Sequence, residues 1–375
     1  MENGKALTHI VGTFLIQAEG AFLNDAGLGK GEDRTTTVPK TMSDFKDKFP
    51  YVSSQSWKHW LRETFKEENP DEPKAILKAI GPGSAKGTTN KIGTDMDPIV
   101  YAEDDIFGYM RSEKGQGKQV EEDETEDEME DEEKPEKKTK TKTKSVMRPS
   151  PFSASILMSL RRTGWRGLDE AYVHLKEGSP LPYSTEFYNT QLQGVFGLNY
   201  SRLGVFRNEG DRIELDEKYQ KQYEVEKKIM VQQETDAGKI YVTNQNPRKD
   251  RATKILKALA VLRGGAKQAQ FGTEVSPKIL IIAGLSCGNL IFNDLFEDTK
   301  EGPRLKLATF EELLRDYQDR IITPVYFGLR TGYLHFESER ELKEWQKNRP
   351  PQAKPIVQIC TPIEAVDQLT GGLPQ

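Results

Sequence analysis

The chain has 375 residues, 30% of them charged, and a formal net charge of −5. A chain of this length can bury a full core as one large domain or about two. Its two cysteines exclude a disulfide framework, and its four histidines show no metal-ligand spacing, so we expect neither a metal nor a cofactor. No stretch approaches the ~20 apolar residues of a membrane span, and the N-terminus lacks a secretory leader, so we expect a soluble, cytoplasmic protein.

The charge is unevenly distributed along the chain. Residues 121–133 contain eleven acids and no base, and setting them aside changes the formal charge from −5 to +6. The surrounding segment 113–147 is first acidic and then lysine-rich, and it lacks the apolar residues that a core needs, which predicts a disordered insertion. The remaining chain is mildly basic, which permits a nucleic-acid partner without requiring one.

Apolar residues alternate over residues 6–18, as in a strand that is buried on both faces. A glycine-rich polar loop follows, and its side chains suit contact with a nucleic-acid backbone, although a solvated loop has the same composition. The candidate contact residues of this loop are Asn24, Lys30, Arg34 and Lys40. Asp25 is a possible catalytic carboxylate, but a turn residue in a glycine-rich loop is the simpler interpretation.

Residues 50–68, "PYVSSQSWKHWLRETFKEE", predict an amphipathic helix. Either Ser53 or Ser54 can cap its N-terminus, and such a terminus can also receive an anion. One arc of the helix is apolar and consists of Trp57, Trp60, Leu61, Thr64 and Phe65. The adjoining arc is polar and mostly cationic, and it consists of Gln55, Lys58, His59, Arg62 and Lys66. The simplest interpretation of the second arc is a set of solvated side chains, and the alternative is a surface that binds anions.

Later segments complete a six-element core. Residues 106–110 and 151–162 predict two strands that flank the charged insertion, residues 251–265 predict a helix, and residues 276–285 predict a buried strand. The order strand, helix, strand, strand, helix, strand indicates an α+β protein with a ferredoxin-like or RRM-like sheet that carries large insertions. A polar helix is expected within residues 216–234, and two more helices near residues 309–320 and 338–348.

The stretch "RGGAKQAQ", residues 263–270, is a further candidate contact. Gly264 and Gly265 can end the preceding helix, and they also let a ligand approach the backbone amides. A helix end explains the two glycines but not the polar run that follows, in which Lys267 and Gln268 offer a cation and an amide.

Together these segments resemble the backbone subunit of type I CRISPR Cascade complexes, specifically the DevR-like family of type I-B within the RAMP superfamily. The resemblance covers most of the chain. Its most specific parts are "YVSSQSWKHWLRETF" and "RGGAKQAQFGTEVSPKILIIAG", and it also rests on "TTTVPK", "DDIFGYM", "RPSPFSASILMSL" and "PYSTEFYNTQLQGVFGLN".

The resemblance implies a modified RRM-like palm with inserted finger and thumb subdomains. Palm and finger loop would occupy residues 1–112, the charged insertion 113–147, a palm strand 148–163, the thumb or finger insertion 164–247, the rest of the palm 248–300, and an extension packed on the palm 301–375.

The resemblance also implies a noncatalytic subunit that polymerises along CRISPR RNA and presents it for pairing with target DNA. Gln55, Lys58 and Arg62 would hold the RNA phosphates, and the first loop and the "GGAKQ" turn would line the same groove. The implied partners are neighbouring copies, the large subunit, the subunit at the 5′ handle and the repeat endonuclease. Two alternatives remain: a metal-assisted endoribonuclease that uses Asp25, and a protein-interaction scaffold.

Overall fold

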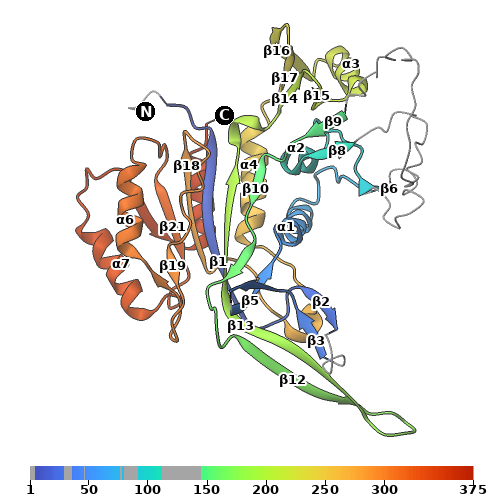
Figure 1. The fold of residues 1–375 in the computed structure, drawn as a ribbon. Helices are drawn as coiled ribbons and strands as arrows, with labels where there is room; N and C mark the ends of the chain where they lie inside the picture. Colours follow the sequence, from blue (N-terminus) through green and yellow to red (C-terminus); the bar gives the residue numbers. More distant parts are fainter. Residues whose placement is uncertain are drawn as a thin grey trace, which may run out of the picture.

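Figure 1 shows the computed structural model, which describes residues 5–28, 36–45, 47–76, 78–79, 92–111 and 145–374. Its largest sheet has twelve strands, and the main path runs β22-β21-β18-β1-β13-β11-β5-β4. Strands β10, β12 and β3 also pair with β13, and β2 pairs with β3. The bounds are β1 His9–Ala21, β2 Asp25–Leu28, β3 Thr36–Pro39, β4 Thr41–Asp44, β5 Asp47–Val52, β10 Phe152–Ala154, β11 Leu157–Ser159, β12 Arg166–Val173, β13 Leu181–Leu198, β18 Ile279–Leu285, β21 Val325–Leu329 and β22 Val357–Cys360.

The predicted α+β class is confirmed, and six elements of the chain follow the order strand, helix, strand, strand, helix, strand, although not all of them are the predicted ones. After β1 come helix α1 (Ser54–Glu68), strands β10 and β13, helix α4 (Arg248–Ala260) and strand β18. In the sheet, β1 lies between β13 and β18 and β10 lies beyond β13, with every neighbouring pair antiparallel. The two crossover helices pack against each other on one face of the sheet.

Strand β1 separates two hydrophobic cores, as the alternation predicts. Ile10, Phe14 and Ile16 point into the core that α1, α4 and α8 (Pro362–Gly371) cover, whereas Val11 and Leu15 point into the core under α6 (Leu307–Asp316) and α7 (Phe336–Asn348). All five side chains are fully buried. The strand is therefore sandwiched between two helical layers.

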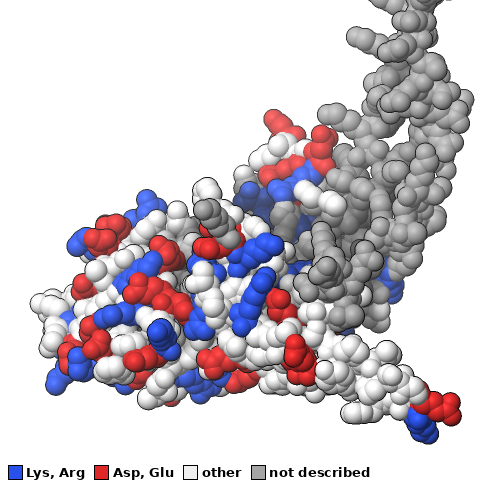
Figure 2. Space-filling view, turned by 60° about the horizontal axis from the view of Figure 1, so that its bottom comes forward, with Lys and Arg blue, Asp and Glu red and all other residues white. Residues whose placement is uncertain are grey.

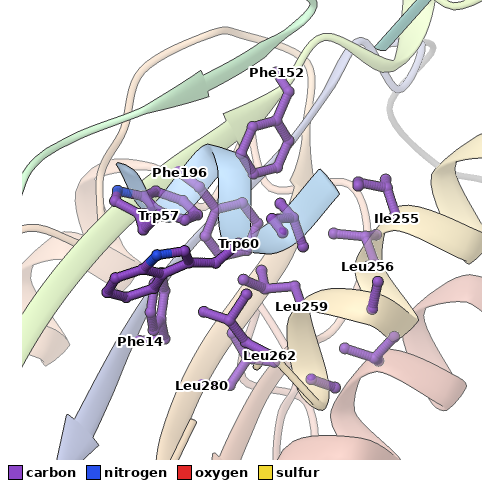
Figure 3. Packing of buried hydrophobic residues seen from close by; sticks show 14 of the residues in the cluster. Phe14, Trp57, Trp60, Phe152, Phe196, Ile255, Leu256, Leu259, Leu262 and Leu280 are labelled. Atoms are coloured by element: carbon purple, nitrogen blue, oxygen red, sulfur yellow. The ribbon is translucent and has the colours of Figure 1, made fainter. Parts of the chain in front are cut away.

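An aromatic cluster fixes α1 on the sheet, and Figure 3 shows it beside the leucines of α4. The Trp57 ring meets Phe14 edge-on at 5.3 Å and Phe152 at 5.9 Å between ring centres. Its indole N–H donates to the backbone oxygen of Ser155 at 2.6 Å, so the polar atom of this buried side chain is satisfied. The predicted apolar arc of α1 is buried, and so are Ile255, Leu256 and Leu259 of α4.

One of the two predicted middle strands does not form. Residues 102–107 form helix α2 (Ala102–Phe107), which ends at Gly108 with φ 70°, so a strand over 106–110 is wrong and only β8 (Tyr109–Arg111) is extended there. The core strands are instead β10 and β11, which divide the expected strand 151–162, and β13. Because β13 is central to the main sheet, residues 164–247 are not wholly an insertion.

A second sheet of six strands lies at the far end of the molecule from the β12–β13 hairpin (Figure 1). Its order is β16-β17-β14-β15-β9-β8. The bounds are β9 Ser145–Arg148, β14 Val205–Glu209, β15 Arg212–Ile213, β16 Ile229–Thr235 and β17 Gly238–Thr243. The polar helix expected within 216–234 is shorter, because α3 (Glu217–Val225) ends before β16.

Strands β8 and β9 pair antiparallel across the charged segment. Residues 145–147, which the composition assigned to a disordered insertion, are therefore strand residues. The rest of that predicted insertion, 113–144, lies outside the described residues.

Arg148 joins the second sheet to the helices of the first. Its buried guanidinium forms ion pairs with Asp105 of α2 and Glu214, and it donates to the backbone oxygen of Val205 at 2.9 Å. Asp105 also pairs with Arg251 of α4. Removing one partner from such a buried network leaves an uncompensated charge, which typically costs about 3–5 kcal/mol.

The C-terminal region contains the two predicted helices, α6 and α7, and two elements that the sequence analysis did not predict, β22 and α8. Helix α8 begins with a capping box, in which Thr361 accepts from the Glu364 amide and Glu364 accepts from the Thr361 amide. The motif T-P-I-E is the sequence signature of such a start.

The remaining described elements are short. They are β6 Lys78–Ala79, β7 Ile92–Gly93, β19 Phe296–Glu297, β20 Arg304–Leu305, the 3₁₀ turn η2 Tyr200–Arg202 and α5 Gln268–Phe271. Among the helices of the described ranges, none combines the length and the apolar character that crossing a bilayer requires.

Candidate nucleic-acid interface

Helix α1 begins as predicted, with Ser53 as its cap. The Ser53 hydroxyl accepts from the Ser56 amide at 3.2 Å and lies 2.7 Å from the Ser56 hydroxyl. Ser54 is the first helical residue and is half-buried. The cap therefore satisfies one of the free amides of the first turn and positions the residues that follow.

The cationic arc of α1 lies over Phe107, the last residue of α2. The guanidinium carbon of Arg62 is 4.9 Å from the Phe107 ring centre, and the Lys58 ammonium is 6.0 Å from it. Lys58 also donates to the Ser150 hydroxyl and to the Phe152 backbone oxygen, both at 3.3 Å. Burial, with a smaller contribution from Arg62, lowers the pKa of Lys58. The arc is thus half-buried against α2 and is not a simply solvated face.

Glu103 of α2 faces the same arc from below. Its side chain is buried, and neither carboxylate oxygen has a hydrogen-bond partner within the described part of the chain. The nearest cation is Lys66, at 3.8 Å, which also pairs with Glu63 at 3.0 Å. Burial raises the pKa of Glu103 to about 7, although Lys66 and Arg62 oppose the shift.

The other two members of the predicted arc face solvent. Gln55 is exposed, and so is His59, whose ring nitrogen lies 4.0 Å from Glu63. The three residues therefore differ in setting: Gln55 is exposed, Lys58 is held by Ser150 and Phe152, and Arg62 lies over Phe107 of α2.

The first loop contributes less than predicted. Asn24 is buried and donates to the Tyr51 backbone oxygen, so its side chain is part of the local structure. Asp25 is exposed and accepts from the Gly27 amide at 2.6 Å. This contact is typical of an aspartate in a turn, as the simpler interpretation of this residue expects. Lys40 is exposed between β3 and β4. Lys30 and Arg34 lie outside the described residues.

The two glycines of the "GGAKQ" turn do not end α4, which stops at Ala260. Gly264 has φ 142° and Gly265 has φ 110°, values that favour glycine. A Cβ atom would overlap the Trp60 side chain at Gly264, and Leu23 and Gln268 at Gly265. Close packing with α1 and the first loop is therefore the physical reason for both glycines.

The polar run after the glycines also folds back on the protein. The Lys267 ammonium lies 4.5 Å from the Phe22 ring centre and 3.4 Å from the Thr185 hydroxyl. The Gln268 amide donates to the Gly264 backbone oxygen. Both side chains are half-buried, so each offers only part of its polar surface to a ligand.

The structure brings three predicted segments together: α1, the first loop and the glycine turn. The Ala266 amide donates to the Leu23 backbone oxygen at 3.0 Å, and the Arg263 amide donates to the Thr64 hydroxyl at 3.0 Å. A cavity of about 310 Å³ lies where the turn meets α1, and its lining includes His59, Trp60, Gly264 and Gly265. We call the exposed side of these three segments the α1 surface.

The β12–β13 hairpin extends away from this body (Figure 1). Figure 2 shows the arm as mostly uncharged, with charged side chains near its end. Three of its large apolar side chains are more than half exposed: Leu168, Tyr172 and Leu181, at 54%, 64% and 57%. Exposed apolar side chains grouped on one arm indicate a surface that contacts another molecule.

The sequence analysis missed two residues of α2 that contact the cationic arc, Glu103 and Phe107. The run "AEDDIF" carries a signal, since an apolar pair follows three acids as at a helix start. Which of the acids faces the cations depends on how α2 packs, and the sequence alone does not give that.

Comparisons with known proteins agree with the fold. No protein-family model matches the chain, and no curated protein matches it in sequence. One solved structure, described as "CRISPR RNA-guided surveillance complex, pre-nicking", contains a chain of similar fold with a TM-score of 0.50 and 10% sequence identity. The match covers 97% of this chain and 99% of that chain. A chain of a second structure, "CRISPR RNA-guided surveillance complex", matches with a TM-score of 0.46, 11% identity and the same coverage.

Proposed function

We propose that this protein is a noncatalytic guide-RNA-binding subunit of a CRISPR Cascade complex, of the type I-B, DevR-like kind. The observation that carries the proposal is the α1 surface, where Lys58 and Arg62 are held side by side over Phe107. Cationic side chains placed in this way can contact the phosphates of an RNA of any sequence, and base pairing then supplies the specificity. The fold similarity to chains of RNA-guided surveillance complexes supports the proposal.

The proposed partners follow from this role. Copies of the chain bind side by side along one CRISPR RNA, the other Cascade subunits cap the assembly, and target DNA pairs with the exposed bases. In this arrangement the β12–β13 hairpin is the thumb, and its exposed apolar side chains contact the RNA bases or the adjacent copy. We also propose that the chain is divided into the palm, finger and thumb regions that the resemblance implies.

The endoribonuclease alternative depends on Asp25, and no specific observation favours it, because the carboxylate accepts from the amide two residues further on. The scaffold alternative does not explain two half-buried cations placed together over one aromatic ring. We therefore propose that the subunit binds RNA without cutting it.

The experiment that tests the proposal compares the wild type with the triple variant Gln55→Ala, Lys58→Ala, Arg62→Ala. The affinity for a single-stranded CRISPR RNA is measured over a series of salt concentrations. Loss of two phosphate contacts flattens the log-log salt slope by roughly 1.4, at ~0.7 per contact for a single strand.

The matched control is the double variant Arg340→Ala, Lys347→Ala, which removes two exposed cations from α7. We expect its salt slope to equal that of the wild type. An unchanged slope in the triple variant, or an equal change in the control, would refute the α1 surface as the RNA contact. Incubation of labelled RNA with a divalent cation tests the noncatalytic role, since Asp25-dependent shortening would contradict it.

A further inference from the structure

A second cavity, of about 450 Å³, lies on the face of the main sheet opposite α1. Gln17 of β1 forms part of it and alternates with Val11 and Leu15, which point away from α1 into the other core. Gln191 of β13 lies beside Gln17 in the strand pairing and also lines the cavity. The volume falls within the range of ordinary small-ligand sites, which is about 300–1,000 Å³.

Two cations at the rim of this cavity form no direct ion pair within the described part of the chain, although the Glu274 carboxylate acts on Arg330 from a longer distance. Within the described residues neither Arg330 nor Lys300 forms an ion pair, and both are exposed. A third cation, Lys278, is held by Glu274. The Arg330 amide donates to the Lys278 backbone oxygen at 2.9 Å, which fixes the backbone of Arg330 beside the cavity. Two exposed cations at one rim suit a ligand with a compact anionic group.

Amide side chains line the inner part of the cavity. Gln191 is only 4% exposed, and its oxygen accepts from the Tyr333 hydroxyl. Its NH₂ group donates to no acceptor among the described residues and is therefore available to a ligand, as is the side chain of Gln17. Paired amides of this kind can donate to and accept from the edge of a nucleic-acid base.

Two carboxylates limit the charge of a ligand here. Glu301 lies at the rim, 3.2 Å from a ring nitrogen of His335, and Glu19 is exposed beside Gln17. They disfavour a second phosphate within the cavity, while Glu19 can accept from a base amino group. The lining thus suits one anionic group and one hydrogen-bonding ring system.

The cavity is tied to the root of the β12–β13 hairpin. Arg161 donates to the Asn189 backbone oxygen at 3.1 Å and pairs with Asp298 at 2.9 Å. Asp298 lies just before Lys300 and Glu301, so the loop that forms the rim is fixed to the strand that continues into the hairpin. The cavity therefore lies beside the part of β13 that leads into the hairpin.

We propose that this cavity binds one nucleotide of a single nucleic-acid strand, with its phosphate at Arg330 and Lys300 and its base at Gln17 and Gln191. The inference extends the proposed RNA-binding function, and it uses a different face of the molecule from the α1 surface. The two sites can therefore fail independently.

The test is isothermal titration of the nucleic-acid-free full chain with cytidine monophosphate and, separately, with inorganic phosphate. We expect the nucleotide to bind more tightly than phosphate. Arg330→Ala weakens both ligands about tenfold, since a hydrogen bond to a charged group is lost, whereas Gln17→Ala weakens only the nucleotide. The control Arg340→Ala changes neither, and the triple variant of the α1 surface still binds the nucleotide.

Three results would overturn this proposal: no nucleotide binding by the folded wild type, equal affinity for nucleotide and phosphate, or the same affinity in Arg330→Ala as in the wild type. Competition by a peptide carboxylate with equal strength would also overturn it in favour of a protein partner. Circular dichroism of each variant confirms that it is folded. If the salt slope of the α1 variant is unchanged while Arg330→Ala loses the nucleotide, the function proposed above fails and this site stands.

Discussion

The guanidinium carbon of Arg62 lies 4.9 Å from the centre of the Phe107 ring. This cation–π contact joins the helix that carries the cations to a short helix whose own side chains are buried. Phe107 is therefore a positioning residue, because it limits where Arg62 can lie.

Replacing this ring by an aliphatic side chain tests the positioning role. In Phe107→Leu we expect RNA affinity to fall about two- to fivefold, because a contact of about 0.5–1 kcal/mol no longer holds the cation. The salt slope remains that of the wild type, because the number of cations is unchanged. Phe107→Tyr restores the affinity. A flatter slope in Phe107→Leu would show that the substitution removes a phosphate contact outright.

The buried carboxylate of Glu103 makes stability depend on pH. Its pKa in the folded protein is about 7, above the ordinary value of 4.5, so between these values the folded protein binds more protons than the unfolded chain. The free energy of unfolding therefore falls as pH rises through this window, by at most about 1.4 kcal/mol per pH unit from this group.

Denaturant unfolding of the wild type and Glu103→Gln at several pH values between 5 and 8 measures this effect. The difference in stability between the two proteins should shift in favour of Glu103→Gln as pH rises. A constant difference across the window would mean that Glu103 is ionised throughout.

The close approach of Gly264 to Trp60 predicts a steric effect on α1. In Gly264→Ala a Cβ atom meets the indole ring at a backbone φ of 142°, so we expect a loss of stability of about 1–3 kcal/mol from the backbone alone. Gly272 is the matched control, because it also has positive φ, 57°, but its Cβ would meet nothing within 4 Å. Thermal unfolding of both variants separates the clash from the backbone preference, and an equal loss in both would contradict the steric explanation.

Removing the exposed apolar side chains of the β12–β13 hairpin should weaken assembly without weakening folding. Substituting serine for Leu168, Tyr172 and Leu181 removes exposed apolar side chains, so the stability should change little. On an RNA long enough for several copies, sedimentation should show fewer bound copies than the wild type gives. On an RNA that holds a single copy, the affinity should remain closer to that of the wild type. Normal assembly of the triple variant would remove the hairpin from the proposed interface.

Local patterns predicted the elements whose burial follows from their own periodicity. The five apolar residues of α1 and the alternation of β1 each lie as expected, because one repeat decides which side chains face the core. Strand β13 was not recognised, since half of it crosses the core and half forms an exposed hairpin, and no single pattern spans both.

The candidate site shows the same division. The cationic arc is a property of one helix and was predicted, whereas the surroundings of Lys58 and Arg62 come from α2 and from Ser150 and Phe152. The apolar end of α2 was predicted as part of a strand, and its Asp105 is paired by Arg148 and Arg251, which come from distant parts of the chain. Contacts between segments so far apart in sequence leave no local pattern.

The antiparallel pairing of Arg111 with Val146 brings the two ends of the charged segment together, which makes this a site where a foreign domain can be inserted. Because both ends of the intervening segment emerge beside each other at the edge of one small sheet, its length has little bearing on the two cores, and the entropy of closing such a loop grows only slowly with length. Changes in the length of that segment therefore cost the fold little stability. A fluorescent domain or an affinity tag can be inserted between these two strands for imaging the assembled particle.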